Sequence, residues 1–275
     1  MIKELIRNNS IAYSILRPSY HFILKIIDLF NSFLFLLVPS RGLKNYQQMQ
    51  RRAYDGYTKN FDDSKNLCVG SFDAHEKYPY EDYLLEHYDG DYGSALDFAS
   101  GIGRMMGRMH VHFDIVDGVD LNSNNLEFAK TYLSNLGIKE ERYSLFLSDG
   151  IGVQGINKKY DFIYSTIALQ HICVHSIRTK IFKDLNRLLK DGGQSCFQMG
   201  FGWDNKIHWF DNHYTARSTN AGCDVTIPNS DHLDAITKDF ELVGFRDIKY
   251  ELKISPHPKL GDRYHPIWIF MHMRK

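Results

Sequence analysis

The stretch Ala95–Arg104 constrains the fold of this 275-residue chain more than any other feature. It reads as a short apolar strand, a glycine-rich turn and the start of a helix, and Asp120 ends the next apolar run. Gly101 and Gly103 let a ligand approach the backbone closely, because glycine has no Cβ. Asp120 lies 17 residues beyond Gly103, where an acid accepts hydrogen bonds from ribose hydroxyls. The stretch therefore predicts a site for a nucleoside-bearing cofactor.

Apolar runs alternate with amphipathic segments over the following hundred residues. The expected strands are 95–99, 115–120, 143–147, 162–165 and 194–199. One intervening helix is expected to have Ser123 as its N-cap and to end at Gly137, and a second ends at Gly192. Such alternation predicts a doubly wound, mostly parallel sheet that binds its ligand outside the carboxyl ends of its strands.

The C-terminal part departs from this alternation. After a helix near 230–242, the apolar runs Ile248–Ile254 and Ile267–Met273 follow each other without a helix between them. Strands joined in this way pair antiparallel. We therefore expect an antiparallel strand at the end of the sheet.

The composition excludes several classes of function. The chain has 33 basic and 33 acidic residues, so it lacks the electrostatic footprint of a nucleic-acid-binding protein. Its four cysteines have neither zinc-ligand nor disulfide-framework spacing, and no metal site is predicted. The spacing of Asp204, His208 and Asp211 also matches no established metal-ligand pattern.

Residues 1–50 are expected to form a helical appendage. The segment Phe22–Val38 is mostly apolar, but its polar residues fall on one helical stripe and basic residues flank it. It is too short and too charged for a spanning helix, which needs about 20 apolar residues, and no signal-peptide cleavage site follows it. Two interpretations stay open. Residues 20–38 form either an in-plane helix that associates peripherally with the inner face of the membrane, or a cap helix that packs on the main domain or on a second subunit. In both, the protein is expected to be cytoplasmic.

The glycine spacing does not favour a dinucleotide. The dinucleotide fingerprint is G-x-G-x-x-G, whereas here Gly107 stands one place too late. Asp97 lies just before the turn, where a carboxylate would repel a diphosphate but would suit an ammonium group.

The segment Asp97–Arg104 resembles the first motif of class I S-adenosylmethionine-dependent methyltransferases, which usually reads acid-x-Gly-x-Gly-x-Gly. Ala99 replaces the first glycine, a departure expected to be mild, and Ser100 stands where Cys or Thr is frequent. Four further motifs of that family have counterparts in order. They are Val119–Leu121, Leu147–Gly150, Tyr160–Ser165 with the following Ile167–Ile172, and Leu188–Gly193.

The resemblance implies a Rossmann-like α/β fold, a seven-stranded sheet with an antiparallel last strand, and S-adenosylmethionine as cofactor. It implies that the cofactor contacts are Asp97, Ala99, Ser100, Gly101, Gly103, Asp120, Leu121, Asp149, Gly150, Ser165 and Gln170. Each of the three acids has a structural alternative: Asp97 as a strand-end cap bound by backbone N–H groups, Asp120 as the N-cap of the next helix and Asp149 as the start of a turn.

His171 is the candidate catalytic residue. It follows the fourth expected strand, and the ordinary pKa of histidine suits proton abstraction near neutrality. The alternative is a structural histidine packed between two helices.

Residues 51–93 are expected to form a Tyr-rich cap over the cofactor site. Residues 94–275 are expected to form the methyltransferase domain, with an acceptor-binding insertion at about 200–229. Candidate acceptor contacts are His75, Tyr80, Trp203, His208, His213 and Tyr214. The same aromatic residues could instead form a lid that packs on the core. We expect methylation at oxygen of a small or carbohydrate-like acceptor. The alternatives are a membrane lipid or quinone-type acceptor, and a non-catalytic cofactor-binding partner protein.

Overall fold

The computed structural model describes residues 22–23, 26, 29–30, 33–34, 36–58, 77–202, 207–212, 214, 224–256 and 265–275. The chain divides into two compact units, Met1–Gln48 and Met49–Lys275, and the boundary falls within helix α3 (Pro39–Thr58). Among the residues described, no helix has both the length and the apolar character needed to cross a membrane.

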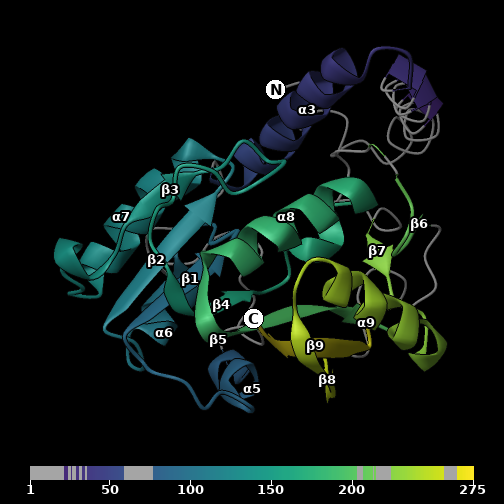
Figure 1. The fold of residues 1–275 in the computed structure, drawn as a ribbon. Coiled ribbons are helices and arrows are strands. Elements are labelled where there is room, and N and C mark those ends of the chain that lie inside the picture. The colour runs from purple at the N-terminus through teal and green to yellow at the C-terminus, as the bar shows by residue number, and fades with distance from the viewer. Residues whose placement is uncertain are drawn as a thin grey trace, which may run out of the picture. The chain divides into compact units, whose positions relative to one another are not determined.

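A seven-stranded sheet forms the centre of the second unit (Figure 1), with the order β3-β2-β1-β4-β5-β9-β8. Its strands are β1 (Ser94–Phe98), β2 (Ile115–Asp120), β3 (Leu145–Leu147), β4 (Tyr160–Ser165), β5 (Leu189–Phe201), β8 (Arg246–Ile254) and β9 (Ile267–Arg274). Neighbours among β1 to β5 pair in parallel, whereas β9 lies antiparallel between β5 and β8. The predicted doubly wound sheet with its antiparallel last strand is confirmed.

Helices cover both faces of this sheet. On one face α5 (Tyr80–Leu85) contacts α6 (Arg104–Met109), which contacts α7 (Ser123–Asn135). On the other face α8 (His175–Leu188) contacts α9 (Leu233–Leu242). The short elements are η1 (Glu140–Arg142), η2 (Leu169–His171), η3 (Ser230–His232) and the parallel pair β6 (Ile207–His208) and β7 (Val225–Thr226).

Two local expectations are corrected. The N-cap of α7 is Asn122 and not Ser123, because the Asn122 side chain accepts from the backbone N–H of Asn124 at 2.8 Å. Strand β3 begins at Leu145 and not at residue 143, because the N–H of Ser144 is bound by the Asp117 carboxylate at 2.6 Å.

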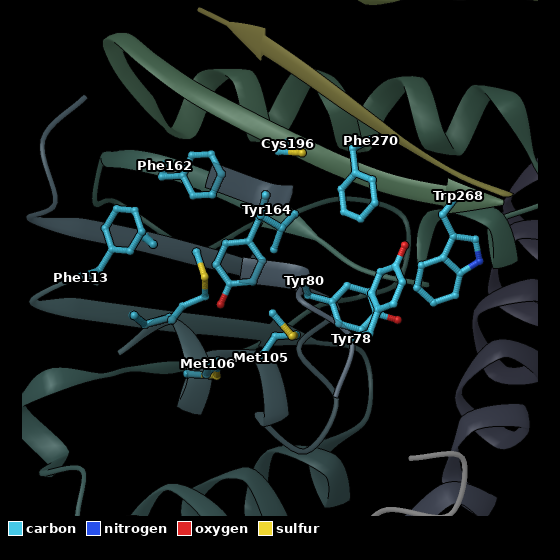
Figure 2. Close-up of a cluster of buried hydrophobic side chains, with 14 of the residues drawn as sticks. Tyr78, Tyr80, Met105, Met106, Phe113, Phe162, Tyr164, Cys196, Trp268 and Phe270 are labelled. Atoms are coloured by element: carbon cyan, nitrogen blue, oxygen red, sulfur yellow. The ribbon is translucent and has the colours of Figure 1, made fainter. Parts of the chain in front are cut away.

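The core on the α5–α6 face is unusually aromatic (Figure 2). Tyr78 meets Tyr80 edge-on, with 4.8 Å between ring centroids, and Trp268 of β9 packs on both. Phe113 stacks on Phe162 of β4 at 5.8 Å. Such pairs stabilise a core beyond the area that they bury, and here they join the segment before β1 to the last strand of the sheet.

Two buried histidines make the fold sensitive to acid. His110 ends α6, and neither of its ring nitrogens has a hydrogen-bond partner within the described part of the chain. Burial, followed by the charge of Arg142, lowers the pKa of His110 to about 4. Burial and the neighbouring His87 likewise lower the pKa of His272 to about 4. Both are neutral in the folded protein at pH 7.

We expect the free energy of unfolding to fall as the pH drops from about 6.5 to about 4. In this range the two histidines bind protons in the unfolded chain but stay neutral in the folded one. The loss is about 3 kcal/mol for each histidine. Urea unfolding at several pH values will measure it, and His110→Leu should flatten the dependence. His112→Leu is the matched control, since His112 is exposed two residues away. Equal slopes for the two variants would contradict the assignment.

Candidate active site

The carboxyl edge of the sheet brings together residues of four of the five sequence motifs, whereas the fifth, Leu188–Gly193, lies at the opposite edge, where β5 begins. Asp97 lies near the end of β1, Asp120 ends β2, Asp149 follows β3, and Gln170 and His171 lie in η2 after β4. Strand β1 pairs with β2 on one side and with β4 on the other, so the strand order reverses at β1. Such a switch point is where open α/β sheets bind their ligands.

The turn after β1 has an unusual backbone. Gly101 and Gly103 have φ values of +55° and +80°, and no atom lies within 4 Å of the place where a Cβ on Gly101 would stand. Ala99 also lies in the left-handed region, at φ +61°. The expectation that alanine is a mild replacement for the first glycine is therefore corrected, because this conformation costs a residue with a Cβ about 1–2 kcal/mol.

Replacing Ala99 by Gly should increase the free energy of unfolding by up to about 1 kcal/mol. The gain is smaller than the full cost of the left-handed conformation, because glycine also has more conformational freedom in the unfolded chain. Urea unfolding measures the change. Ala168→Gly is the control, because Ala168 has a φ of −107° and its replacement should destabilise by about 0.5–1 kcal/mol. A decrease in stability for both variants would contradict the strain at Ala99.

Asp120 ties the glycine-rich turn to the end of β2. Its Oδ2 accepts from the backbone N–H of Gly101 at 3.0 Å, and its Oδ1 accepts from Asn122 N at 2.9 Å and from Asn125 Nδ2 at 3.0 Å. Asp120 is not the helix cap, since Asn122 has that position. Burial raises the pKa of the Asp120 carboxyl, and these hydrogen bonds partly offset the effect.

Asp97 is a buried acid that forms no salt bridge with the residues that the structure describes, although the charge of Arg104 partly opposes the rise in its pKa. It is 2% exposed, and its Oδ2 accepts no hydrogen bond from the residues that the structure describes. Burial, followed by the charge of Asp120, raises the pKa of Asp97 well above its usual range. The hydroxyl of Ser100 is also buried without a partner in the described part. An open glycine turn beside unsatisfied acceptors fits a ligand that carries an ammonium group.

The other predicted cofactor residues have clear local roles. Oδ1 of Asp149 accepts from Ile151 N and Gly152 N, which caps the turn that contains Gly150. The Ser165 hydroxyl is fully buried and donates to the carbonyl of Phe98 at 2.8 Å, so it joins the ends of β4 and β1. Leu121 is half-buried directly after β2.

His171 lies in a polar cluster that includes one residue absent from the predicted site. Its Nδ1 lies 2.9 Å from Oδ1 of Asp224, and Oδ2 of Asp224 lies 3.3 Å from Nε2 of Gln170. Gln170 Oε1 accepts from the backbone N–H of Gly200 at 2.9 Å. Burial alone would raise the pKa of Asp224, but His171 and then His265 lower it to about 2. Asp224 is therefore ionised. Gln170 connects Asp224 to the backbone of β5 through its two hydrogen bonds.

His265 is a second residue that the motifs did not predict. Its Nε2 lies 3.8 Å from Oδ2 of Asp224, and its ring packs flat on Gly200, where a Cβ would lie 2.0 Å from the ring. One sequence signal would have found it. Strand β9 runs antiparallel to β5, so the residue that precedes β9 must lie at the carboxyl end of β5. Asp224 has no such signal, because a bridge between Phe201 and Ile227 places it.

Three of the six predicted acceptor contacts lie in the part of the chain that the structure describes. His75, Trp203 and His213 lie outside the described residues. Tyr80 is completely buried in the aromatic core, and Tyr214 is also buried. His208 lies in β6, where its N–H donates to Asp211. From the Tyr-rich segment it is Tyr54 that approaches the site, with its ring centroid 6.2 Å from that of His171. No group of three or more candidate metal ligands occurs among the described side chains.

Comparisons with known proteins identify the domain and the fold. Residues 95–193 match a family model described as a methyltransferase domain, whereas a search of curated proteins found no match. Among solved structures, N-methyltransferase NodS from Bradyrhizobium japonicum is similar, with a TM-score of 0.55 at 9% identity over 81% of this chain and 98% of that one. A methyltransferase from Clostridium acetobutylicum has a TM-score of 0.51 at 16% identity, over 75% and 93%. The [4+2]-cyclase SpnF has 0.53 at 14%, over 71% and 80%.

At these identities the solved structures show the fold alone, while the matched domain defines the class. The fold and the domain are those of the class I S-adenosylmethionine-dependent methyltransferases. The protein is accordingly a methyltransferase enzyme with S-adenosylmethionine as its cofactor, as the motifs predicted.

Proposed function

We propose that this enzyme methylates a hydroxyl oxygen of a small, carbohydrate-like acceptor. The observation that carries the proposal is the contact between His171 Nδ1 and Asp224 Oδ1, 2.9 Å long, at the end of β4. Oxygen acceptors usually need a general base. The aromatic and polar residues of the segments 51–93 and 200–229 suit a sugar-like molecule.

For the cofactor, we propose that acids at three strand ends bind three different groups of the ligand. Asp97 binds the ammonium group, Asp120 the ribose hydroxyls and Asp149 the adenine amino group, with the turn Ala99–Gly103 beside the ligand. The unpartnered Oδ2 of Asp97 and the open space at Gly101 support this arrangement. The bound cofactor supplies a methyl group activated by its sulfonium.

In this proposal His171 acts through its Nε2. The ionised Asp224 keeps the proton of the imidazole on Nδ1, which leaves Nε2 as the basic nitrogen. In the described part of the chain no hydrogen bond occupies Nε2. It would accept the proton of the acceptor hydroxyl as the oxygen bonds to the transferred methyl group, whose bond to the sulfonium sulfur breaks, so that the proton stays on the imidazole and the sulfur leaves as a neutral thioether. Half-burial of His171 limits the access of water to this nitrogen.

The experiment uses methyl-labelled cofactor with fractionated cell extract and asks which fraction takes up label. We expect an O-methyl product, and His171→Gln should lose about 100-fold or more in the rate of label transfer. His175→Gln is the matched control, because His175 forms a similar pair with Asp239 at 3.0 Å outside the site. An N-methyl product, or an unchanged rate with His171→Gln, would refute the proposed chemistry.

Two alternatives give different results in the same assay. A lipid or quinone-type acceptor would place the label in the membrane fraction, and we propose peripheral association with the inner face of the membrane through residues 20–38. A non-catalytic cofactor-binding protein would bind S-adenosylhomocysteine but transfer no label to any fraction.

A further inference from the structure

The segment from Phe22 to Val38 exposes a concentration of large apolar side chains. The exposed ones among its described residues are Phe22, Ile23, Ile26, Leu29, Phe30, Phe33, Leu36, Leu37 and Val38, with exposed fractions from 39% to 78%. Soluble proteins rarely leave so many neighbouring apolar side chains in water, and such patches mark interaction sites. The patch therefore needs an occupant.

All of these side chains except that of Val38 share one face of a helix. Three rows repeat every seven residues: Phe22, Leu29 and Leu36; Ile23, Phe30 and Leu37; and Ile26 with Phe33. Seven residues are close to two helical turns, so the rows lie beside one another. The result is a broad apolar stripe, wider than the narrow seam by which two helices form a coiled coil.

Charge around the stripe selects the occupant. Residues 1–58 contain eight basic and three acidic residues, whereas the remaining chain contains 25 basic and 30 acidic ones. The N-terminal part therefore carries a charge of +5 and the rest −5, although the whole chain is neutral. Arg41, Lys44 and Arg51 of α3 are exposed. A second copy would bring the same positive charge to the stripe, whereas an anionic surface complements it.

We propose that residues 22–38 bind in the plane of a membrane surface that carries anionic lipid headgroups. The apolar stripe enters the boundary between headgroups and acyl chains, and the basic residues of α3 bind the headgroups. This inference rests on the membrane association proposed above and names the chemistry of the surface. It does not depend on the acceptor or on His171.

The test uses the full chain and lipid vesicles in flotation assays. Vesicles of phosphatidylcholine with phosphatidylglycerol should bind the protein at least about tenfold more tightly than phosphatidylcholine alone, and added salt should remove the difference. Leu29→Glu with Phe33→Glu should abolish binding, and Arg41→Gln with Lys44→Gln should remove the preference for phosphatidylglycerol. Leu242→Glu is the control, since Leu242 is an apolar residue of α9 that is 85% exposed.

Three results would overturn the inference. Equal binding to both vesicle types would remove the anionic preference and leave membrane association in place. No binding to either would remove both. Self-association in ultracentrifugation that Phe33→Glu abolishes, without vesicle binding, would assign the stripe to a second copy of the chain. Calorimetric binding of S-adenosylhomocysteine by each variant shows whether the methyltransferase domain is intact, so failure here is distinct from failure of the proposed chemistry.

Discussion

Replacing Asp97 by Asn will weaken the binding of S-adenosylhomocysteine by about 100-fold or more and will raise the stability of the ligand-free protein. The loss of affinity follows because a neutral amide cannot pair with an ammonium group in a buried site. The gain in stability follows because burial of the Asp97 carboxylate destabilises the folded state. Burial and the charge of Asp120 both raise the pKa of this group. The folded state of the variant no longer carries this cost, so its free energy of unfolding at pH 7 should increase.

The sign of this effect distinguishes Asp97 from other buried acids of the sheet. Asp117 is fully buried in β2, but its carboxylate accepts from Lys158 at 2.9 Å and from Tyr160 at 2.8 Å. Asp117→Asn is thus the matched control, and it should lower stability without changing cofactor affinity. Calorimetry gives the affinities and thermal unfolding gives the stabilities. If Asp97→Asn destabilises the ligand-free protein as Asp117→Asn does, then the Asp97 carboxylate is already stabilised by the fold and does not require a cationic ligand.

The same arrangement couples cofactor binding to a proton. Because the folded pKa of Asp97 is raised, its penalty is present at neutral pH and disappears as the carboxyl is protonated at lower pH. Binding of an ammonium group favours the carboxylate and so releases a proton wherever Asp97 was protonated. Titrations in buffers of different ionisation enthalpy will detect this release at mildly acidic pH, and Asp97→Asn should abolish it.

Replacing Asp224 by Asn will slow methyl transfer to an oxygen acceptor by about 100-fold or more, with cofactor affinity unchanged. The amide keeps a similar shape but no longer fixes the His171 proton on Nδ1, so Nε2 ceases to be the dependable base. Label transfer measures the rate. Nitrogen NMR of His171 reports the tautomer independently of any acceptor, and it should shift from the Nδ1–H form in the variant.

Asp239→Asn provides the comparison for Asp224. Asp239 accepts from the indole N–H of Trp209 at 2.8 Å and pairs with His175, so its replacement should lower stability and leave the His171 tautomer as it was. Loss of activity in both variants with an unchanged His171 tautomer would mean that Asp224 only supports the fold.

Much of the fold followed from local pattern. The alternation of apolar strands with amphipathic helices determines the parallel sheet, and two successive strands without a helix determine the antiparallel β9. Asp97, Asp120 and Asp149 follow from position alone, because parallel strands end at a common edge. Local backbone geometry was less accessible. The left-handed conformation of Ala99 depends on the whole turn and cannot be read from one alanine.

The sequence by itself determined the class of this enzyme and predicted the edge of the sheet at which we propose the cofactor site, since both depend on motifs whose residues lie close together in the chain. Only the tertiary structure decided which groups surround His171. Asp224 lies 53 residues from His171, and His265 reaches the site because Gly200 leaves room for its ring. Tyr54 and Tyr80 both belong to the Tyr-rich segment, but they lie in different places. Tyr80 packs on Trp268 in the core, whereas the ring of Tyr54 lies near that of His171. Contacts between distant segments leave no local pattern in the sequence, so the partners of His171 can be identified only in the folded chain.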